Sequence, residues 1–203
     1  MATPKQISAL QKRADTGDAS SQYALAQHYL AGDSVPQNVE LARELVQNAA
    51  NGDNGDALYL LGVWAQTGEF EAENPEAAAA FYARAGDLDH GPALLNLGIL
   101  HQVGLGTPQN LNAATEAYER AAKAGSGHAA ANLGHLYAAG SLPDEQIDLN
   151  NAIKYYKMAI KLGYGEARTA LMEAQAALGG PNLAANDSAA KSPSLWKRLL
   201  GFR

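Results

Sequence analysis

Cysteine is absent from this 203-residue sequence, and so is any long apolar run. Without cysteine the chain cannot form disulfides, thiolate metal sites or a thiol nucleophile. No apolar stretch approaches the roughly 18 residues that a membrane-spanning helix needs. The segment before Asp15 contains no long apolar stretch either, so we expect no secretory signal. These absences argue against secreted, disulfide-stabilised and membrane-spanning proteins.

Aromatic residues and positive charge are also scarce. Aromatics make up 7% of the chain although hydrophobic residues make up 47%, and the formal net charge is −6. A negative chain is poorly suited to binding nucleic acid by neutralising phosphates, so we expect no nucleic-acid partner. The net charge is −3 over residues 1–60, −6 over 61–120 and +3 over 121–203. A solvated surface is the simplest explanation of the acidic middle, although Glu69, Glu71, Glu73, Glu76, Asp87 and Asp89 could also attract a basic partner.

An internal repeat dominates what is present. The Leu-Gly pairs that begin at Leu61, Leu97 and Leu133 are 36 residues apart. We number each repeat from the residue four before that leucine, so that Ala57, Ala93 and Ala129 occupy repeat position 1, and Ser21 occupies it one period upstream. A fixed period of this length is typical of solenoids and related arrays.

Small and capping residues recur at fixed positions of this repeat. Position 12 holds Gly32, Gly68, Gly104 and Gly140; position 22 holds Ala42, Ala78, Ala114 and Ala152; and position 29 holds Ala49, Ala85, Ala121 and Ala159. Position 18 holds Asn38, Asn74 and Asn110, with Asp148 after a two-residue insertion in the fourth repeat. The glycine predicts the end of a first helix, and the Asn or Asp predicts the N-cap of a second one.

Glycine also recurs inside the predicted first helix, directly after the leucine. Gly62, Gly98 and Gly134 lie where glycine costs about 1 kcal/mol relative to alanine. The acceptance of that cost at one position of three repeats predicts a close approach between packed helices.

These residues resemble the Sel-1-like repeat, a relative of the tetratricopeptide repeat. The third repeat carries the family pattern in Ala93, Leu97, Gly98, His101, Gly104, Gly106, Ala114, Ala121 and Ala122. The fourth carries it in Ala129, Leu133, Gly134, Tyr137, Gly140, Ala152, Tyr156 and Ala159, whereas the second departs from it at Ala65. The resemblance implies an α-solenoid that serves as a binding scaffold, and it suits a bacterial cytoplasmic protein.

The predicted fold is all-α, an α-α superhelix of about four and a half helix-turn-helix repeats. Residues 1–17 are expected to form an N-terminal capping helix and residues 18–179 the solenoid, with repeats at 19–54, 55–90, 91–126 and 127–164 and a half-repeat at 165–178. Residues 180–203 are interpreted as a flexible linker followed by a short amphipathic segment.

By analogy with tetratricopeptide domains, the first helices are expected to line a concave groove. Side chains at positions 3, 4, 7 and 10 would face a partner peptide or helix, and amides and tyrosines there can donate, accept and bury apolar area. The candidates for partner binding are Tyr23, Gln27, Tyr59, Val63, Gln66, Asn96, Ile99, Gln102, Asn132 and His135. Packing between helices is the competing explanation for each of them.

The C-terminal segment carries a second candidate contact, formed by Leu195, Trp196, Leu199 and Leu200. This apolar stripe, with its basic neighbours, could cap the last helix, dock a partner protein or touch a membrane surface. Any membrane contact is expected through this tail alone.

Catalytic and metal-binding patterns were not found. The five histidines form no His-Glu-x-x-His pair, and no catalytic residue, metal or cofactor is predicted. The leading hypothesis is a non-enzymatic protein-interaction scaffold or adaptor with a protein partner. A membrane-associated regulatory or assembly factor tethered by the tail is the alternative, and a hydrolase or cell-wall-ligand binder is the third.

Overall fold

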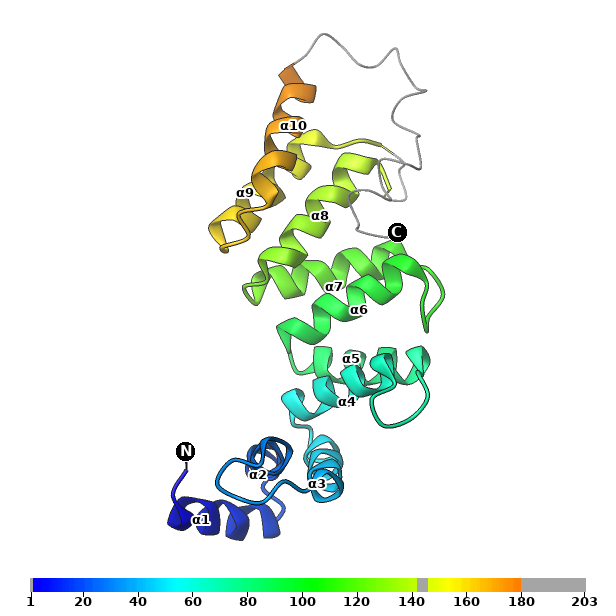
Figure 1. The fold of residues 1–203 in the computed structure, drawn as a ribbon. Coiled ribbons are helices and arrows are strands. Elements are labelled where there is room, and N and C mark those ends of the chain that lie inside the picture. Colours follow the sequence, from blue (N-terminus) through cyan, green and yellow to red (C-terminus); the bar gives the residue numbers. More distant parts are fainter. Residues whose placement is uncertain (1, 142–145, 180–203) are drawn as a thin grey trace. The chain divides into compact units, whose positions relative to one another are not determined.

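The computed structural model describes residues 2–141 and 146–179, and every regular element in these ranges is an α-helix (Figure 1). The helices are α1 (Pro4–Asp15), α2 (Ala19–Ala31), α3 (Val39–Asn51), α4 (Gly55–Thr67), α5 (Pro75–Asp87), α6 (Gly91–Val103), α7 (Leu111–Lys123), α8 (Gly127–Ala139), α9 (Leu149–Lys161) and α10 (Ala167–Gly179). The predicted all-α repeat architecture is therefore confirmed. The chain divides into two compact units, residues 1–129 and residues 130–203.

The second helix of each repeat begins at the predicted cap. The side chains of Asn38, Asn74, Asn110 and Asp148 accept a hydrogen bond from the backbone amide three residues later. Such a cap satisfies one of the amides that a helix N-terminus leaves without an intrahelical partner. Pro75 follows its cap directly as the first residue of α5, where its missing amide costs nothing.

The first helix of each repeat ends at a left-handed glycine. The φ angles are +66° at Gly32, +68° at Gly68, +74° at Gly104 and +58° at Gly140. An L-residue pays a steric penalty in this region that glycine avoids. The glycines at position 12 therefore stop the helix, as the sequence predicted.

One backbone hydrogen bond closes the loop between the two helices of every repeat. The amide of the cap residue donates to the carbonyl oxygen at position 9, and the N–O distances are 3.0 Å for Asn38 to Tyr29, 2.7 Å for Asn74 to Ala65, 2.8 Å for Asn110 to His101 and 2.9 Å for Asp148 to Tyr137. The fourth loop is two residues longer than the others and still makes this bond. The backbone at position 9 is therefore held in the same way whichever side chain it carries.

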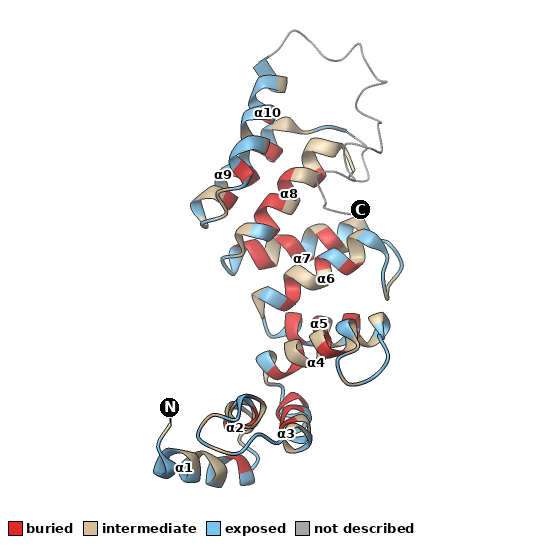
Figure 2. Ribbon diagram, in the orientation of Figure 1, coloured by how far each residue is buried: buried red, intermediate tan, exposed pale blue. Residues whose placement is uncertain are grey.

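In the first unit each helix packs against its neighbours in sequence, from α1 to α7, and α4 also contacts α6. Helix α1 contributes Ala14, which is buried, and Ile7 and Leu10, which pack against the core. Figure 2 shows the buried residues running along the inner sides of the packed helices. Contacts between sequence neighbours are typical of a solenoid.

A tyrosine ring lies directly on the mid-helix glycine of three repeats. A Cβ atom added at Gly62 would lie 2.5 Å from the Tyr82 ring, and one at Gly98 would lie 2.6 Å from the Tyr118 ring. The sequence predicted a close approach of helices at these glycines. The structure shows that the group in contact is the aromatic ring from the second helix of the same repeat, and that both rings are fully buried.

Arginine side chains join successive repeats in the first unit. Arg84 of α5 donates to the Ala50 carbonyl at 3.0 Å and pairs with Asp53 at 3.2 Å, beyond the end of α3. One repeat later, Arg120 of α7 donates to the Gly86 carbonyl and pairs with Asp89 at 2.8 Å. Each guanidinium thereby satisfies a carbonyl at the end of the preceding second helix.

The second unit contains most of α8 together with α9 and α10. The rings of Tyr137 and Tyr155 are stacked with centroids 5.4 Å apart, and Tyr156 lies on Gly134 as its counterparts do in the first unit. Helix α10 packs on α9, and its Ala167 and Ala174 are buried, while Met172 is 70% exposed.

Candidate functional site

Eight of the ten candidate partner-binding residues lie on the first helices of the first unit. Helix α2 carries Tyr23 and Gln27, α4 carries Tyr59, Val63 and Gln66, and α6 carries Asn96, Ile99 and Gln102. All eight are at least partly exposed, and Ile99 is 36% exposed. Residues three or four apart share one side of a helix, so the three helices present these side chains as a row, which we call the first-helix face.

At one end of this face, tyrosines from two repeats lie close together. Tyr23 shares a hydrogen bond with Gln27, and the Asp56 carboxylate and the Tyr59 side chain are close enough to influence its hydroxyl. Burial, reinforced by the Asp56 carboxylate, raises the pKa of the Tyr23 phenol. The Tyr59 ring also lies 5.0 Å from the His90 ring. These contacts join α2, α4 and the start of α6.

The amides of the face also support the core. The Tyr82 hydroxyl donates to Gln66 Oε1 at 2.7 Å, and the Tyr118 hydroxyl donates to Gln102 Oε1 at 2.6 Å. Burial raises the pKa of Tyr82 to about 12, while a hydrogen bond from the Asn96 side chain opposes that shift. Gln66, Gln102 and Asn96 therefore satisfy buried tyrosines, which is the packing role that the sequence left open.

The remaining two candidates, Asn132 and His135, lie on α8 in the second unit. His135 Nδ1 is 2.9 Å from the Tyr156 hydroxyl, and the two rings meet edge to face at 5.2 Å. Burial lowers the pKa of His135 and raises the pKa of Tyr156. The imidazole of His135, at repeat position 7, is therefore the hydrogen-bond partner of the Tyr156 hydroxyl, a role that glutamine at position 10 has in the two preceding repeats.

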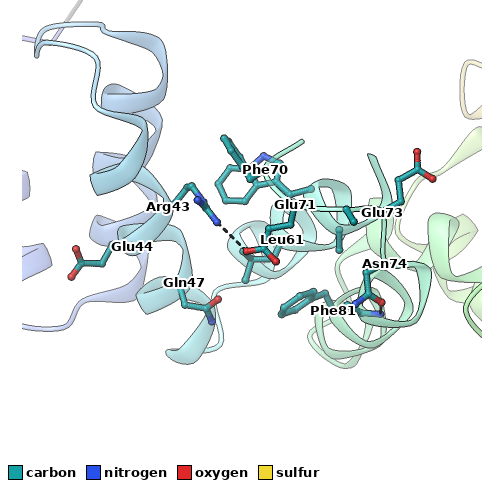
Figure 3. Close-up of a pocket in the computed structure, with 13 residues that line it drawn as sticks. Arg43, Glu44, Gln47, Leu61, Phe70, Glu71, Glu73, Asn74 and Phe81 are labelled. Carbon is teal, nitrogen blue, oxygen red and sulfur yellow. Dashed lines mark hydrogen bonds and ion pairs between the residues drawn. The ribbon is translucent and has the colours of Figure 1, made fainter. Parts of the chain in front are cut away.

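A pocket of about 630 Å³ opens on another side of α4 (Figure 3). Leu61, Trp64 and Ala65 form its α4 wall. Successive residues turn by about 100° around a helix, so these three point away from Tyr59, Val63 and Gln66. The other lining residues come from α3, α5 and the loop that joins α4 to α5: Arg43, Glu44, Gln47, Phe70, Glu71, Ala72, Glu73, Asn74, Ala77 and Phe81.

The pocket combines an aromatic wall with a charged rim. The Trp64 and Phe70 rings meet edge to face with centroids 4.7 Å apart, and the Arg43 guanidinium lies 4.8 Å from the Phe70 centroid. Arg43 also pairs with Glu71 at 3.3 Å and with Glu40 at 3.7 Å. The rim lining carries three glutamates against this one arginine, which leaves it negative.

The sequence interpretation missed this pocket, although one signal was available. Ala65 is the departure at position 9, where the other repeats carry Tyr29, His101 and Tyr137. Ala65 lines the pocket, and its side chain is smaller than the tyrosine or histidine at position 9 of the other repeats. The departure from the repeat pattern at position 9 therefore coincides with the pocket.

The acidic residues of the middle segment make different contacts in the structure. Glu71 pairs with Arg43, and Glu71 and Glu73 line the pocket, whereas Asp89 pairs with Arg120 in the next repeat. Glu69 and Glu76 are exposed.

Hydrogen bonds to other groups of the protein are made by the side chains of His28, His90, His101 and His135. His101 Nδ1 lies 3.1 Å from the Thr107 hydroxyl, and burial lowers the pKa of His101. His90 accepts from the Ala93 amide through Nδ1 at 3.2 Å and faces Asp56 through Nε2 at 3.1 Å. Within residues 2–141 and 146–179, no three His, Asp or Glu side chains are grouped so that they could hold a metal ion.

The proposed tail contact of Leu195, Trp196, Leu199 and Leu200 lies outside the described residues. In the described part of the chain, no helix has the length and apolar character needed to cross a membrane.

Comparisons with known proteins agree with this architecture. The Sel1 repeat family model matches residues 19–54, 55–90, 91–126 and 127–164. A Sel1 repeat protein from Oxalobacter formigenes has a similar structure, with a TM-score of 0.78 at 28% identity over 88% of this chain and 72% of that one. No curated protein matches the sequence.

A protective antigen of uropathogenic Escherichia coli, c5321, which displays an SLR fold, is similar with a TM-score of 0.76 at 20% identity. The match covers 84% of this chain but 36% of the antigen, so the present chain spans about a third of that protein. Proteins of this repeat class are generally protein-interaction scaffolds and are typically non-enzymatic. Because four consecutive matches cover most of the sequence, the chain belongs to the Sel1 repeat family.

Proposed function

We propose that this protein is a non-enzymatic interaction scaffold whose first-helix face binds an extended segment or a helix of a partner protein. The observation that carries the proposal is the row of partly exposed side chains on α2, α4 and α6. The direct contact between α4 and α6 supports it, because the row then continues from one repeat to the next.

The chemistry of the face suits a peptide. Val63 and Ile99 offer apolar area to side chains of a partner, and Gln27 adds an exposed amide that can donate and accept. The tyrosines add rigid amphipathic surface at a low entropic cost. Asn132 and His135 hold the corresponding repeat positions on α8, where we propose contacts of the same kind.

Glutamine amides that are hydrogen-bonded to buried tyrosines should favour partner binding because they are already held in place, and not because each makes a strong contact. Gln66 and Gln102 each use their oxygen on a tyrosine hydroxyl, which fixes the amide relative to the helix. A partner that meets a pre-positioned group loses less side-chain entropy on binding. We therefore expect affinity from many contacts, with about 1–2 kcal/mol lost per single substitution.

The test is affinity purification with Val63→Asp/Ile99→Asp, which places two charges on the partly exposed apolar residues of the face. A partner that binds this face should be recovered with wild-type protein and lost with the double variant. Leu88→Asp is the matched control because Leu88 is an apolar residue that is 46% exposed beyond α5, outside the face. Tyr59→Ala and Asn132→Ala should each weaken binding of the purified partner, as measured by calorimetry. The proposal would be overturned if the double variant still recovered the partner and if Tyr59→Ala and Asn132→Ala both bound it with wild-type affinity.

A further inference from the structure

We propose that the pocket lined by Trp64, Ala65 and Phe81 is a second binding site, for a peptide segment in which a bulky apolar side chain is flanked by lysine or arginine. The site is independent of the first-helix face, because it lies on another side of α4 and is built from α3, α5 and the connecting loop. A volume of about 630 Å³ falls in the range of pockets that bind specific ligands.

The wall of the pocket selects for an apolar side chain. Leu61, Trp64, Phe70 and Phe81 line it, and Trp64 is only 9% exposed, so its indole is held by the surrounding residues. The T-shaped contact with Phe70 fixes the two rings relative to one another. An aromatic or branched aliphatic side chain that enters would bury area against a preformed surface.

The rim selects for positive charge. Glu44, Glu71 and Glu73 line the pocket, and Arg43 is the one cation among its lining residues. Arg43 is already engaged, because it pairs with Glu71 at 3.3 Å and with Glu40 at 3.7 Å and lies over the Phe70 ring. Glu44 and Glu73 are exposed. A lysine or arginine beside the apolar anchor would therefore meet carboxylates whose charge the arginine offsets only in part.

The repeat itself supplies a variant that closes the pocket. Tyr29 and Tyr137 occupy position 9 in the first and fourth repeats, and their carbonyl oxygens make the same loop-closing hydrogen bond as Ala65. The local backbone thus accepts tyrosine at this position. Ala65→Tyr should fill the pocket while the helices and loop keep their conformation.

The probe is a set of short fluorescently labelled synthetic peptides. The first has phenylalanine and leucine between lysines, the second replaces the lysines with glutamate, and the third replaces the apolar residues with serine. The protein is the full chain with Trp196→Phe, which leaves Trp64 as its one tryptophan. Peptide anisotropy reports binding, and Trp64 fluorescence reports whether the pocket is the site.

We expect saturable binding of the lysine peptide with a change in Trp64 emission, and at least tenfold weaker binding of the other two peptides. Ala65→Tyr should abolish both signals. Glu44→Gln/Glu73→Gln should weaken binding several-fold and reduce its salt dependence. Glu116→Gln is the matched control, because Glu116 is exposed and occupies in the third repeat the position that Glu44 holds in the first.

Three results would overturn the proposal: no binding of the lysine peptide, equal binding by Ala65→Tyr, or equal binding of the serine peptide, which would indicate charge attraction alone. If Ala65→Tyr lost its helical circular dichroism, the glutamate variants and the Trp64 emission would decide. Loss of binding in Val63→Asp/Ile99→Asp but not in the pocket variants would place the peptide on the first-helix face instead.

Discussion

The second and third repeats share a core but differ in the surface that they build around it. Both place a tyrosine on a mid-helix glycine, and both hydrogen-bond that tyrosine to a glutamine of the first helix. At position 9, however, the second repeat has Ala65 and the third has His101. At position 14 the second has Phe70, which lines the pocket, whereas the third has Gly106.

Gly106 shows why the two loops diverge. A Cβ atom at Gly106 would collide with the carbonyl group of Pro75, so the third loop lies directly against the start of α5. Phe70 instead turns onto Trp64 and leaves space beside Ala65. The comparison teaches that the glycines shared by both repeats set the packing of the core, while the residues at positions 9 and 14, close to the loop, differ where the second repeat has its pocket.

The largest effect should come from the shared core. Gly98→Leu and Gly62→Leu should each lower the free energy of unfolding by about 3 kcal/mol or more, because the new side chain overlaps a fully buried tyrosine ring. Urea denaturation followed by circular dichroism measures this. Gly179→Ala is the control, since its Cβ would meet no atom within 4 Å. Wild-type stability in both leucine variants would refute the assignment of the rings.

A smaller loss should follow removal of the shared hydroxyl. Tyr82→Phe and Tyr118→Phe should each lower the free energy of unfolding by about 1 kcal/mol, because the hydrogen bond to Gln66 or Gln102 is lost in a partly buried setting. The same denaturation measurement applies. If both variants were as stable as wild type, the tyrosine–glutamine pairs would have no role in holding the repeats.

Exchange of the position-9 residues tests the difference directly. His101→Ala should open the third repeat and cost about 1 kcal/mol, whereas Ala65→Tyr should change the stability by less than about 0.5 kcal/mol. In the Trp196→Phe background, Ala65→Tyr should also reduce acrylamide quenching of Trp64. Undiminished quenching would mean that tyrosine at this position points away from the pocket.

The smallest effect concerns the pH dependence of the free energy of unfolding. At position 9 the third repeat has a titratable residue, His101, whereas the second repeat has Ala65. Burial holds the pKa of His101 below 6.5, so the unfolded state binds more protons than the folded state in this range. Stability from this residue is present above pH 6.5 and is lost as the pH falls toward the lower folded pKa. His101→Tyr should flatten the dependence of unfolding free energy on pH between 7 and 5, with His135 unchanged in both proteins. An identical pH dependence would contradict this.

The sequence predicted the fold because its decisive residues act locally. Asn74 caps the helix that starts beside it, and Gly68 ends the helix that precedes it, so both roles follow from chain neighbours alone. Because the sequence repeats with a fixed period, the same capping and helix-ending roles could be assigned to the corresponding residues of the other repeats. The binding role of the predicted face residues is untested, and it remains a proposal.

The pocket could not be predicted from the sequence in the same way, because it is an empty volume beside a small side chain and its size depends on how several helices pack. Ala65 was visible as a departure from the pattern, but the open volume arises from Arg43, Trp64 and Phe81, which lie on three helices. Likewise, Gln66 looked like a groove residue, and its bond to Tyr82 depends on which rotamers the packed helices allow. Side-chain partners at long range are set by packing, which the period does not encode.

The loop-closing hydrogen bond has a consequence for how such arrays can change. Since the bond from Asp148 to Tyr137 survives two extra residues, the anchor points of a loop are fixed independently of its length. In the fourth repeat, two extra residues between these two points leave the loop-closing hydrogen bond and the Asp148 cap of α9 intact. A connection between paired helices can therefore lengthen while the register of the second helix stays anchored to the first.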